Sequence, residues 1–137
     1  MANSNAVQIV EDFFHEVWQQ QNIDEIDRYV AEDFVITSDG VDIVSRPQFK
    51  AWVAGFLQRI NDFNFEVIES FQNAEGTRVA SRWRVTGKNN GILGSIADQQ
   101  PISFTGTAIW AVSPEGKLLH NWVERSTWAL AKRLRFE

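Results

Sequence analysis

The fold is decided by residues 49–72, FKAWVAGFLQRINDFNFEVIESFQ, because the repeat of apolar side chains changes within this stretch. In its first half the apolar residues recur every three or four positions, the spacing of one face of an α-helix: Phe49, Trp52, Val53, Phe56, Leu57 and Ile60. From Asn64 the repeat becomes two, which is typical of a β-strand, with Phe65, Val67 and Phe71 on one face. The chain is therefore predicted to pass here from a helical half to a sheet.

Two more helices are predicted before this stretch. Ser4 or Asn5 can cap the first helix. Its apolar positions have helical spacing: Val7, Val10, Phe14, Val17 and Trp18. Asn22, with Glu25 three residues later, resembles the capping box that begins a helix. The buried side of this second helix is expected to be Ile26, Tyr29, Val30 and Phe34. A short strand over residues 35–37 then leads toward the third helix.

Three more strands are predicted after it, over residues 79–86, 102–112 and 118–126. The tight turn 114–116, Pro-Glu-Gly, joins the last two strands as a hairpin, and a short helix from Thr127 closes the chain. Helices first and strands afterwards indicate an α+β fold. We expect one domain over residues 1–137, in which three N-terminal helices cover a curved, mostly antiparallel sheet of about four strands and leave a cavity between the layers.

The composition narrows the classes of function. Ten Phe and six Trp suit a wide core or the wall of a pocket. A net charge of −5 is the wrong sign for holding a phosphate backbone, so no nucleic-acid partner is expected. The chain has no Cys and two His, which excludes thiolate chemistry and argues against a transition-metal site. No motif for a cofactor is found either, so none is expected.

The chain also gives no sign of a membrane or of export. No stretch approaches about 18 consecutive apolar residues, so no membrane-spanning helix is expected. The first residues carry neither a basic segment nor a long apolar run, so the expected location is the cytoplasm.

Several short motifs together resemble one family. They are EDF at 32–34, RWRVTG at 82–87, GILG at 91–94 followed by PISFTG at 101–106, and GKLL at 116–119 leading to Trp122. This series, which spans nearly the whole chain, is similar to the SnoaL-like polyketide cyclases of the nuclear transport factor 2-like superfamily. The resemblance implies a cone-shaped α+β fold, a pocket inside the cone and a homodimer.

The resemblance also implies a reaction. The cyclases close a ring by an intramolecular aldol step without metal or cofactor, using a carboxylate or His for proton transfer. The family's Asp after the last-strand Trp falls on Val123 here, and the preceding His falls on Asn121. Another frequent polar place falls near Thr37 or Ser38, and the Tyr of ketosteroid isomerase-like proteins is matched by Phe14. The resemblance thus implies a cyclase- or isomerase-type enzyme for an apolar or polyketide-like substrate, whereas the missing acid/base groups favour a non-catalytic ligand-binding or dimerisation domain.

Two orientations of the last strand remain open. In one orientation Asn121, Val123 and Arg125 face the pocket, so that Asn121 can bind a ligand carbonyl and Arg125 an enolate or carboxylate. In the other, His120 and Glu124 face it and form a base with its partner. The expected pocket-lining residues are Phe14, Trp18, Tyr29, Thr37, Trp52, Phe56, Trp83, Phe104, Trp110, Asn121 and Val123.

Two arginines on an earlier strand leave a similar choice. Arg82 and Arg84 share one face, opposite Trp83. They are either exposed, in solvent or at a dimer interface, or they form an anion-binding pair beside the pocket.

Overall fold

The computed structural model describes residues 5–136. The helical half contains, in order, α1 (Ala6–Phe13), a π-helical continuation (Phe14–Gln19), a 3-10 turn (Ile23–Glu25), α2 (Ile26–Tyr29), β1 (Val30–Ser38), β2 (Val41–Val44) and α3 (Arg46–Gln58). The sheet half contains β3 (Ile60–Gln72), β4 (Arg78–Asn89), a 3-10 turn (Ile92–Gly94), β5 (Pro101–Val112), β6 (Leu118–Ser126) and α4 (Trp128–Phe136). The predicted change from helix to strand therefore occurs directly after α3.

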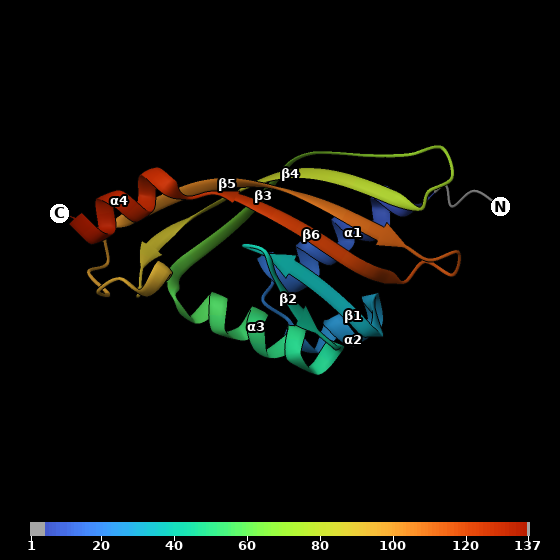
Figure 1. Ribbon diagram of the computed structural model, residues 1–137, viewed down its shortest axis with the longest axis horizontal. Coiled ribbons are helices and arrows are strands. Elements are labelled where there is room, and N and C mark those ends of the chain that lie inside the picture. Colours follow the sequence, from blue (N-terminus) through green and yellow to red (C-terminus); the bar gives the residue numbers. More distant parts are fainter. Residues whose placement is uncertain (1–4, 137) are drawn as a thin grey trace.

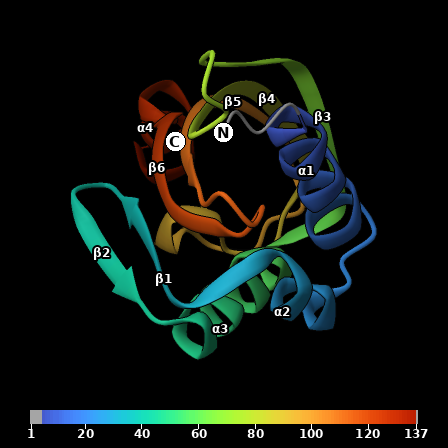
Figure 2. The same cartoon turned by 90° about the vertical axis from the view of Figure 1, so that its right-hand side faces the viewer.

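The strands form one six-stranded sheet in the order β2-β1-β6-β5-β4-β3. All neighbours are antiparallel except β1 and β6, which run parallel. Figure 1 shows α1, α2 and α3 on one side of the sheet, and Figure 2 shows how strongly the sheet curls around its long axis. The predicted α+β class, with three N-terminal helices over a curved and mostly antiparallel sheet, is confirmed.

The second helix is shorter than predicted. It ends at Tyr29, and both Val30 and Phe34 belong to β1. Helical spacing misled here because residues 30–38 are rich in β-branched and aromatic side chains, which suit a strand. Parallel pairing of β1 with β6 then fixes the extended conformation. The sheet gains in this way a strand that reaches well beyond the predicted residues 35–37.

The predicted caps and the count of strands also need correction. Asn22 makes no side-chain capping hydrogen bond, and neither does Asn5, while Ser4 lies outside the described residues. Strand β2 was not predicted, because its four residues are mostly exposed and too few to show a repeat. The sheet has six strands instead of about four, and β2 supplies one of its edges.

The core is organised around Phe13, a residue that lies off the predicted stripe of the first helix. Its ring lies 5.1 Å from the ring of Trp110 on β5, 5.9 Å from Tyr29 and 6.2 Å from Phe49 on α3, measured between centroids. Phe13 and Trp110 are completely buried. Edge-to-face contacts of this kind add to the hydrophobic burial, so this cluster holds α1, α2 and α3 against the sheet.

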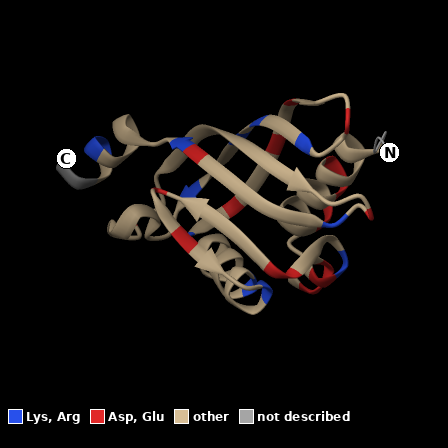
Figure 3. Ribbon diagram, turned by 45° about the vertical axis from the view of Figure 1, so that its right-hand side comes forward, with Lys and Arg blue, Asp and Glu red and all other residues tan. Residues whose placement is uncertain are grey.

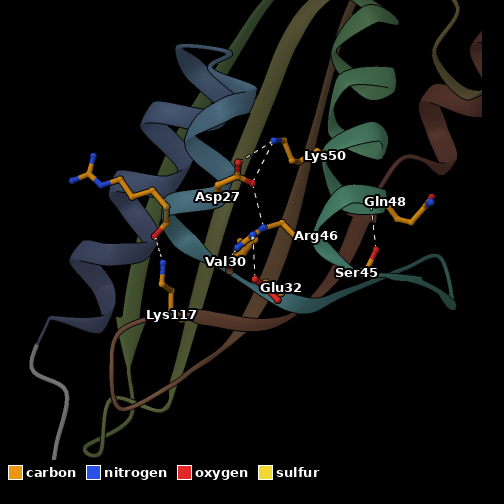
Figure 4. A network of polar contacts seen from close by, with 9 residues as sticks. Asp27, Val30, Glu32, Ser45, Arg46, Gln48, Lys50 and Lys117 are labelled. Atoms are coloured by element: carbon orange, nitrogen blue, oxygen red, sulfur yellow. Dashed lines mark hydrogen bonds and ion pairs between the residues drawn. The ribbon is translucent and has the colours of Figure 1, made fainter.

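The start of α3 is fixed by polar contacts as well (Figure 4). Asp27 on α2 accepts ion pairs from Arg46 Nε at 3.2 Å and from Lys50 Nζ at 3.2 Å. Arg46 also donates to the carbonyl of Val30, and the Ser45 hydroxyl accepts from the Gln48 amide as an N-cap. These contacts join α2, β1 and α3 at one end of the helical layer.

Charged residues are scattered over the surface, with both signs interspersed (Figure 3). Several pair across neighbouring strands: Arg82 with Glu69 at 2.7 Å, Arg84 with Glu66 at 3.4 Å and Lys88 with Asp62 at 3.3 Å. Exposed pairs like these contribute little to stability.

Gly106 on β5 provides a test of the packing between β4 and β5. A Cβ added at this position would lie 2.3 Å from the ring of Trp83, which is buried. We expect Gly106→Ala to lower the free energy of unfolding by about 1–3 kcal/mol, measured by urea titration. Gly55→Ala is the matched control, because its Cβ would meet nothing within 4 Å. Since Gly55 lies inside α3, this control should gain up to about 1 kcal/mol. Equal effects of the two substitutions would contradict the packing described.

Candidate ligand cavity

A cavity lies between the inner face of the sheet and the helices. Its wall is formed by Phe14 and Trp18 from the π-helical segment, Trp52 and Phe56 from α3, and Ile36, Phe63, Phe65, Trp83, Val85, Ala108, Asn121, Val123 and Arg125 from the sheet. Its volume of about 30 Å³ is room for about one water molecule. Ligand sites are roughly ten or more times larger, so the side chains in the wall nearly fill this space.

Aromatic rings make up most of the wall. The Phe65 ring stacks between Trp18, with centroids 6.1 Å apart, and Trp83, with centroids 5.4 Å apart. Trp52 and Phe56 meet Trp18 edge-on at 6.3 and 5.6 Å. These two residues of α3 are only partly buried. They therefore form a side of the cavity that can move with less loss of packing than its fully buried rings.

Phe14 and Trp18 reach the cavity together because they are four residues apart on one helical face. The chain changes from α- to π-helical at Phe14, which adds a residue to the turn. As a result Phe13 points into the core and Phe14 points toward the cavity, although they are neighbours in sequence.

Two polar groups in the wall lack hydrogen-bond partners among the described residues. Asn121 is 5% exposed and its Oδ1 has no partner, although an unpaired buried acceptor is costly. The side chain of Arg125 is 11% exposed, its Nη2 lies 2.6 Å from Asp39 Oδ2, and its buried Nε has no partner. The Arg125 guanidinium also lies over the Phe56 ring, 5.5 Å from the centroid. Two residues of the wall thus carry one unpaired acceptor and one unpaired donor, both fully buried.

The structure decides between the two orientations of the last strand. Asn121, Val123 and Arg125 line the cavity, and His120 and Glu124 point to the outer face of the sheet. Of the residues in the wall, Arg125 alone is ionisable. The cavity therefore contains a cation and an amide, and no side chain that can exchange a proton near neutral pH.

His120 instead belongs to a polar cluster on the outer face. The Thr37 hydroxyl lies 2.6 Å from Asp42 Oδ1 and 2.8 Å from His120 Nε2. An ionised carboxylate only accepts hydrogen bonds, so the Thr37 hydroxyl donates to Asp42. The same hydroxyl then accepts from His120, whose Nε2 carries a hydrogen in this arrangement. The imidazole stacks on Trp122 with centroids 3.9 Å apart. Burial lowers the pKa of His120 despite the opposing influence of Asp42, and Arg78 lowers it further.

Four of the residues expected at the cavity lie elsewhere. Thr37 belongs to the outer face, since side chains alternate along β1 and Ile36 takes the inner position. Tyr29 packs edge-on against Phe13 in the core. Trp110 is completely buried between rings of the helices, and Phe104 packs against Trp83 and Phe56 behind the wall. Residues of the wall that had not been expected are Ile36, Phe63, Phe65, Val85 and Ala108.

The two arginines considered in the sequence analysis do not add an anion-binding site to the cavity. Arg82 and Arg84 lie on the outer face, where each pairs with a glutamate, so they are not a free anion-binding pair. Over residues 5–136, no three His, Asp or Glu side chains come together in a way that could hold a metal ion. No helix in the same range is long and apolar enough to cross a membrane.

A curled sheet whose inner face is covered by N-terminal helices, with a small aromatic cavity between the layers, defines the nuclear transport factor 2-like class of α+β folds. The family model described as a SnoaL-like domain matches residues 10–121. The chain therefore belongs to the SnoaL-like family, which confirms the resemblance found in the sequence. A comparison with curated proteins finds no match.

Solved structures agree with this fold. The chain is similar to a protein from Jannaschia sp. CCS1 assigned as a SnoaL-like polyketide cyclase, with a TM-score of 0.86, 17% identity, and coverage of 96% of this chain and 92% of that one. It is also similar to TsrD from Streptomyces laurentii (0.83, 16%, 98% of both chains). AclR from Streptomyces galilaeus, assigned as a hydroxylase, matches with a TM-score of 0.81 and 21% identity over 98% of both chains. At these identities the likeness establishes the fold alone.

The outer cluster predicts a pH dependence of stability. Because the folded protein lowers the pKa of His120, the unfolded chain takes up this proton first as pH falls. Stability should be complete above the unfolded pKa of about 6.5 and be lost as pH falls from there toward the lower folded value. Urea unfolding at several pH values between 7.5 and 5.5 should show a smaller loss in His120→Gln than in the wild type. Identical losses in the two proteins would contradict the environment described for His120.

Proposed function

We propose that this protein binds a small, largely apolar molecule of the polyketide type in the cavity, without metal or cofactor. The observation that carries the proposal is the pair of unpartnered polar atoms, Asn121 Oδ1 and Arg125 Nε, within a wall of aromatic rings. An apolar wall with a few convergent polar groups is the general character of a small-molecule site. A protein that served only as a solid module would gain stability from apolar side chains at these positions.

Binding requires the cavity to expand. Trp52 and Phe56 are partly exposed side chains on one helix, and Gly55 beside Phe56 has free space around it. Rotamer changes of such side chains are fast and need no change of fold. In this proposal a ligand displaces these two rings from Trp18 and stacks in their place.

The proposal can be tested with 2-naphthol, a neutral planar probe. Its binding should quench Trp fluorescence and raise Tm in proportion to ligand concentration. Val123→Phe fills the cavity and should weaken binding by at least about tenfold, which corresponds to about 1.4 kcal/mol. Glu124→Phe is the matched control, because the same ring then enters on the outer face and should leave the affinity unchanged. Equal affinities for all three proteins, or no binding to the wild type, would contradict a ligand site in the cavity.

The position of Arg125 in the wall of the cavity supports catalysis as a second candidate function. A guanidinium in a water-poor cavity stabilises an enolate, and Asn121 can hold the neighbouring oxygen. In an aldol closure the enolate carbon attacks a carbonyl carbon of the same molecule, and the proton lost from the first carbon ends on the new alkoxide. Since neither residue accepts the proton, the substrate itself or water would have to carry it.

This candidate has a direct kinetic test on a linear poly-β-ketone substrate. Arg125→Met and Asn121→Leu should each lower the rate of ring closure by about 10²-fold or more. His120→Gln and Glu124→Gln should leave the rate unchanged, because both residues face away from the cavity. Unchanged rates in all four variants would rule out these catalytic roles and leave ligand binding as the function.

We also propose a homodimer formed through the outer face of the sheet. Phe71, Ala80, Ile109 and Trp122 are paired in one row across β3, β4, β5 and β6. Phe71, Ile109 and Trp122 are 60%, 42% and 38% exposed, an unusual run of large apolar side chains for a surface. Ile109→Glu should turn a dimer into a monomer in sedimentation analysis, whereas Val41→Glu on the edge strand should not. A wild-type chain that sediments as a monomer would contradict this assembly.

A further inference from the structure

The two unpartnered atoms of the cavity point to the chemistry of its ligand, an inference that rests on the function proposed above. Asn121 and Arg125 lie on the same face of β6, four residues apart, which places their Cα atoms about 13 Å from each other. Val123 lies between them, and apolar side chains surround it. A ligand that satisfies both groups must therefore be polar at two ends and apolar in the middle.

One edge of the Arg125 guanidinium carries two nitrogens, Nη2 and Nε, and only Nη2 has a hydrogen-bond partner. The Nη2 and Nε hydrogens of an arginine point the same way and together match the two oxygens of a carboxylate. Here Nη2 donates to Asp39 at 2.6 Å, while Nε, which is buried, has no partner. Along this edge Asp39 therefore bonds to one nitrogen, and the other nitrogen is left for a carboxylate that can reach both.

Asp39 is suited to give up this contact. Its side chain is 70% exposed, and the residue lies in the turn between β1 and β2 with a φ of 55°. An exposed carboxylate regains hydration when the ion pair opens, so the pair itself contributes little stability. A ligand carboxylate that makes two bonds from inside the cavity can replace the single bond to Asp39.

At the other end of the site, Asn121 requires a different group. Its Oδ1 needs a donor, and a hydroxyl is both donor and acceptor, so it can bond to either atom of the amide. Asn121 is thus the place for a hydroxyl rather than for a second anion.

We propose that the cavity binds a planar aromatic hydroxy acid, whose carboxylate takes Arg125 from Asp39 and whose hydroxyl bonds to Asn121 at the opposite end. The ring system lies against Phe65 and Trp83, where it extends the stack already present. Asp39 holds Arg125 in place while the cavity is empty and competes with the ligand carboxylate.

The test compares three related probes by isothermal titration calorimetry: 6-hydroxy-2-naphthoate, 2-naphthoate and 2-naphthol. The hydroxy acid should bind at least about tenfold more tightly than 2-naphthol, because a hydrogen bond to a charged group contributes more than about 1.4 kcal/mol. It should bind about fivefold more tightly than 2-naphthoate, because a neutral hydrogen bond contributes about 1 kcal/mol. Arg125→Met should weaken the two acids by at least about tenfold more than it weakens 2-naphthol. Asn121→Leu should weaken the two probes that carry a hydroxyl and spare 2-naphthoate.

Asp39→Asn is the most informative variant, because Asp39 is exposed and its replacement should not disturb folding. Removing the competitor should tighten both acids by about three- to tenfold and leave 2-naphthol unchanged. Asp33→Asn, at an exposed position of β1 and with the same change of charge, is the matched control and should have no effect. The control separates release of Arg125 from a general loss of negative charge.

The outcomes distinguish this inference from the proposed function. If 2-naphthol binds as tightly as the two acids, or Asp39→Asn leaves all affinities unchanged, the hydroxy-acid assignment is wrong although the cavity still binds ligands. If none of the three probes binds to the wild type, both the assignment and the proposed function are wrong.

Discussion

The pairing of β6 with β5 and β1 is the constraint on which the site depends. It fixes which side chains of the strand face the helices and which face outward. Asn121 and Arg125 are thereby placed in an aromatic enclosure, whereas His120 joins Thr37 on the opposite surface. A shift of one residue would exchange these two sets. The same strand would then present an imidazole to the cavity, and the chemistry open to the protein would be that of a base.

The enclosure itself follows from the curl of the sheet and from the rings that fill it. Phe13 and Trp110 close the core at one part of the inner face, so the remaining space is limited to the region around Trp18 and Trp83. The space is small because the partly exposed rings of α3 complete the wall. In the proposed mode of binding, the rings of α3 move aside and the ligand supplies the contacts that those rings give up.

The sequence predicted the fold well where one repeat dominated. The α3 segment and the hairpin that ends in β6 were evident because their apolar spacing and turn residues agree. The orientation of β6 was not predictable, since both Trp122 and Val123 are large and apolar and alternation alone could not rank them. Phe13 was missed although it lies three residues after Val10 and four before Val17, because its neighbour Phe14 fits the same helical spacing and both are buried. Phe65 lay in a predicted strand, and only the position of the π-helical segment against β3 shows that it reaches the cavity.

The six tryptophans provide the most direct measurement of the central claim, that a small molecule enters the space between the sheet and the helices. Trp18, Trp52 and Trp83 line the cavity, whereas Trp122 and Trp128 are exposed outside it. Indole N–H resonances, followed by ¹⁵N NMR during a titration with 6-hydroxy-2-naphthoate, report on each of them separately. The account predicts saturable shifts of the three cavity indoles and none for the two outer ones. Shifts confined to Trp122 and Trp128 would place the ligand on the outer surface and contradict it.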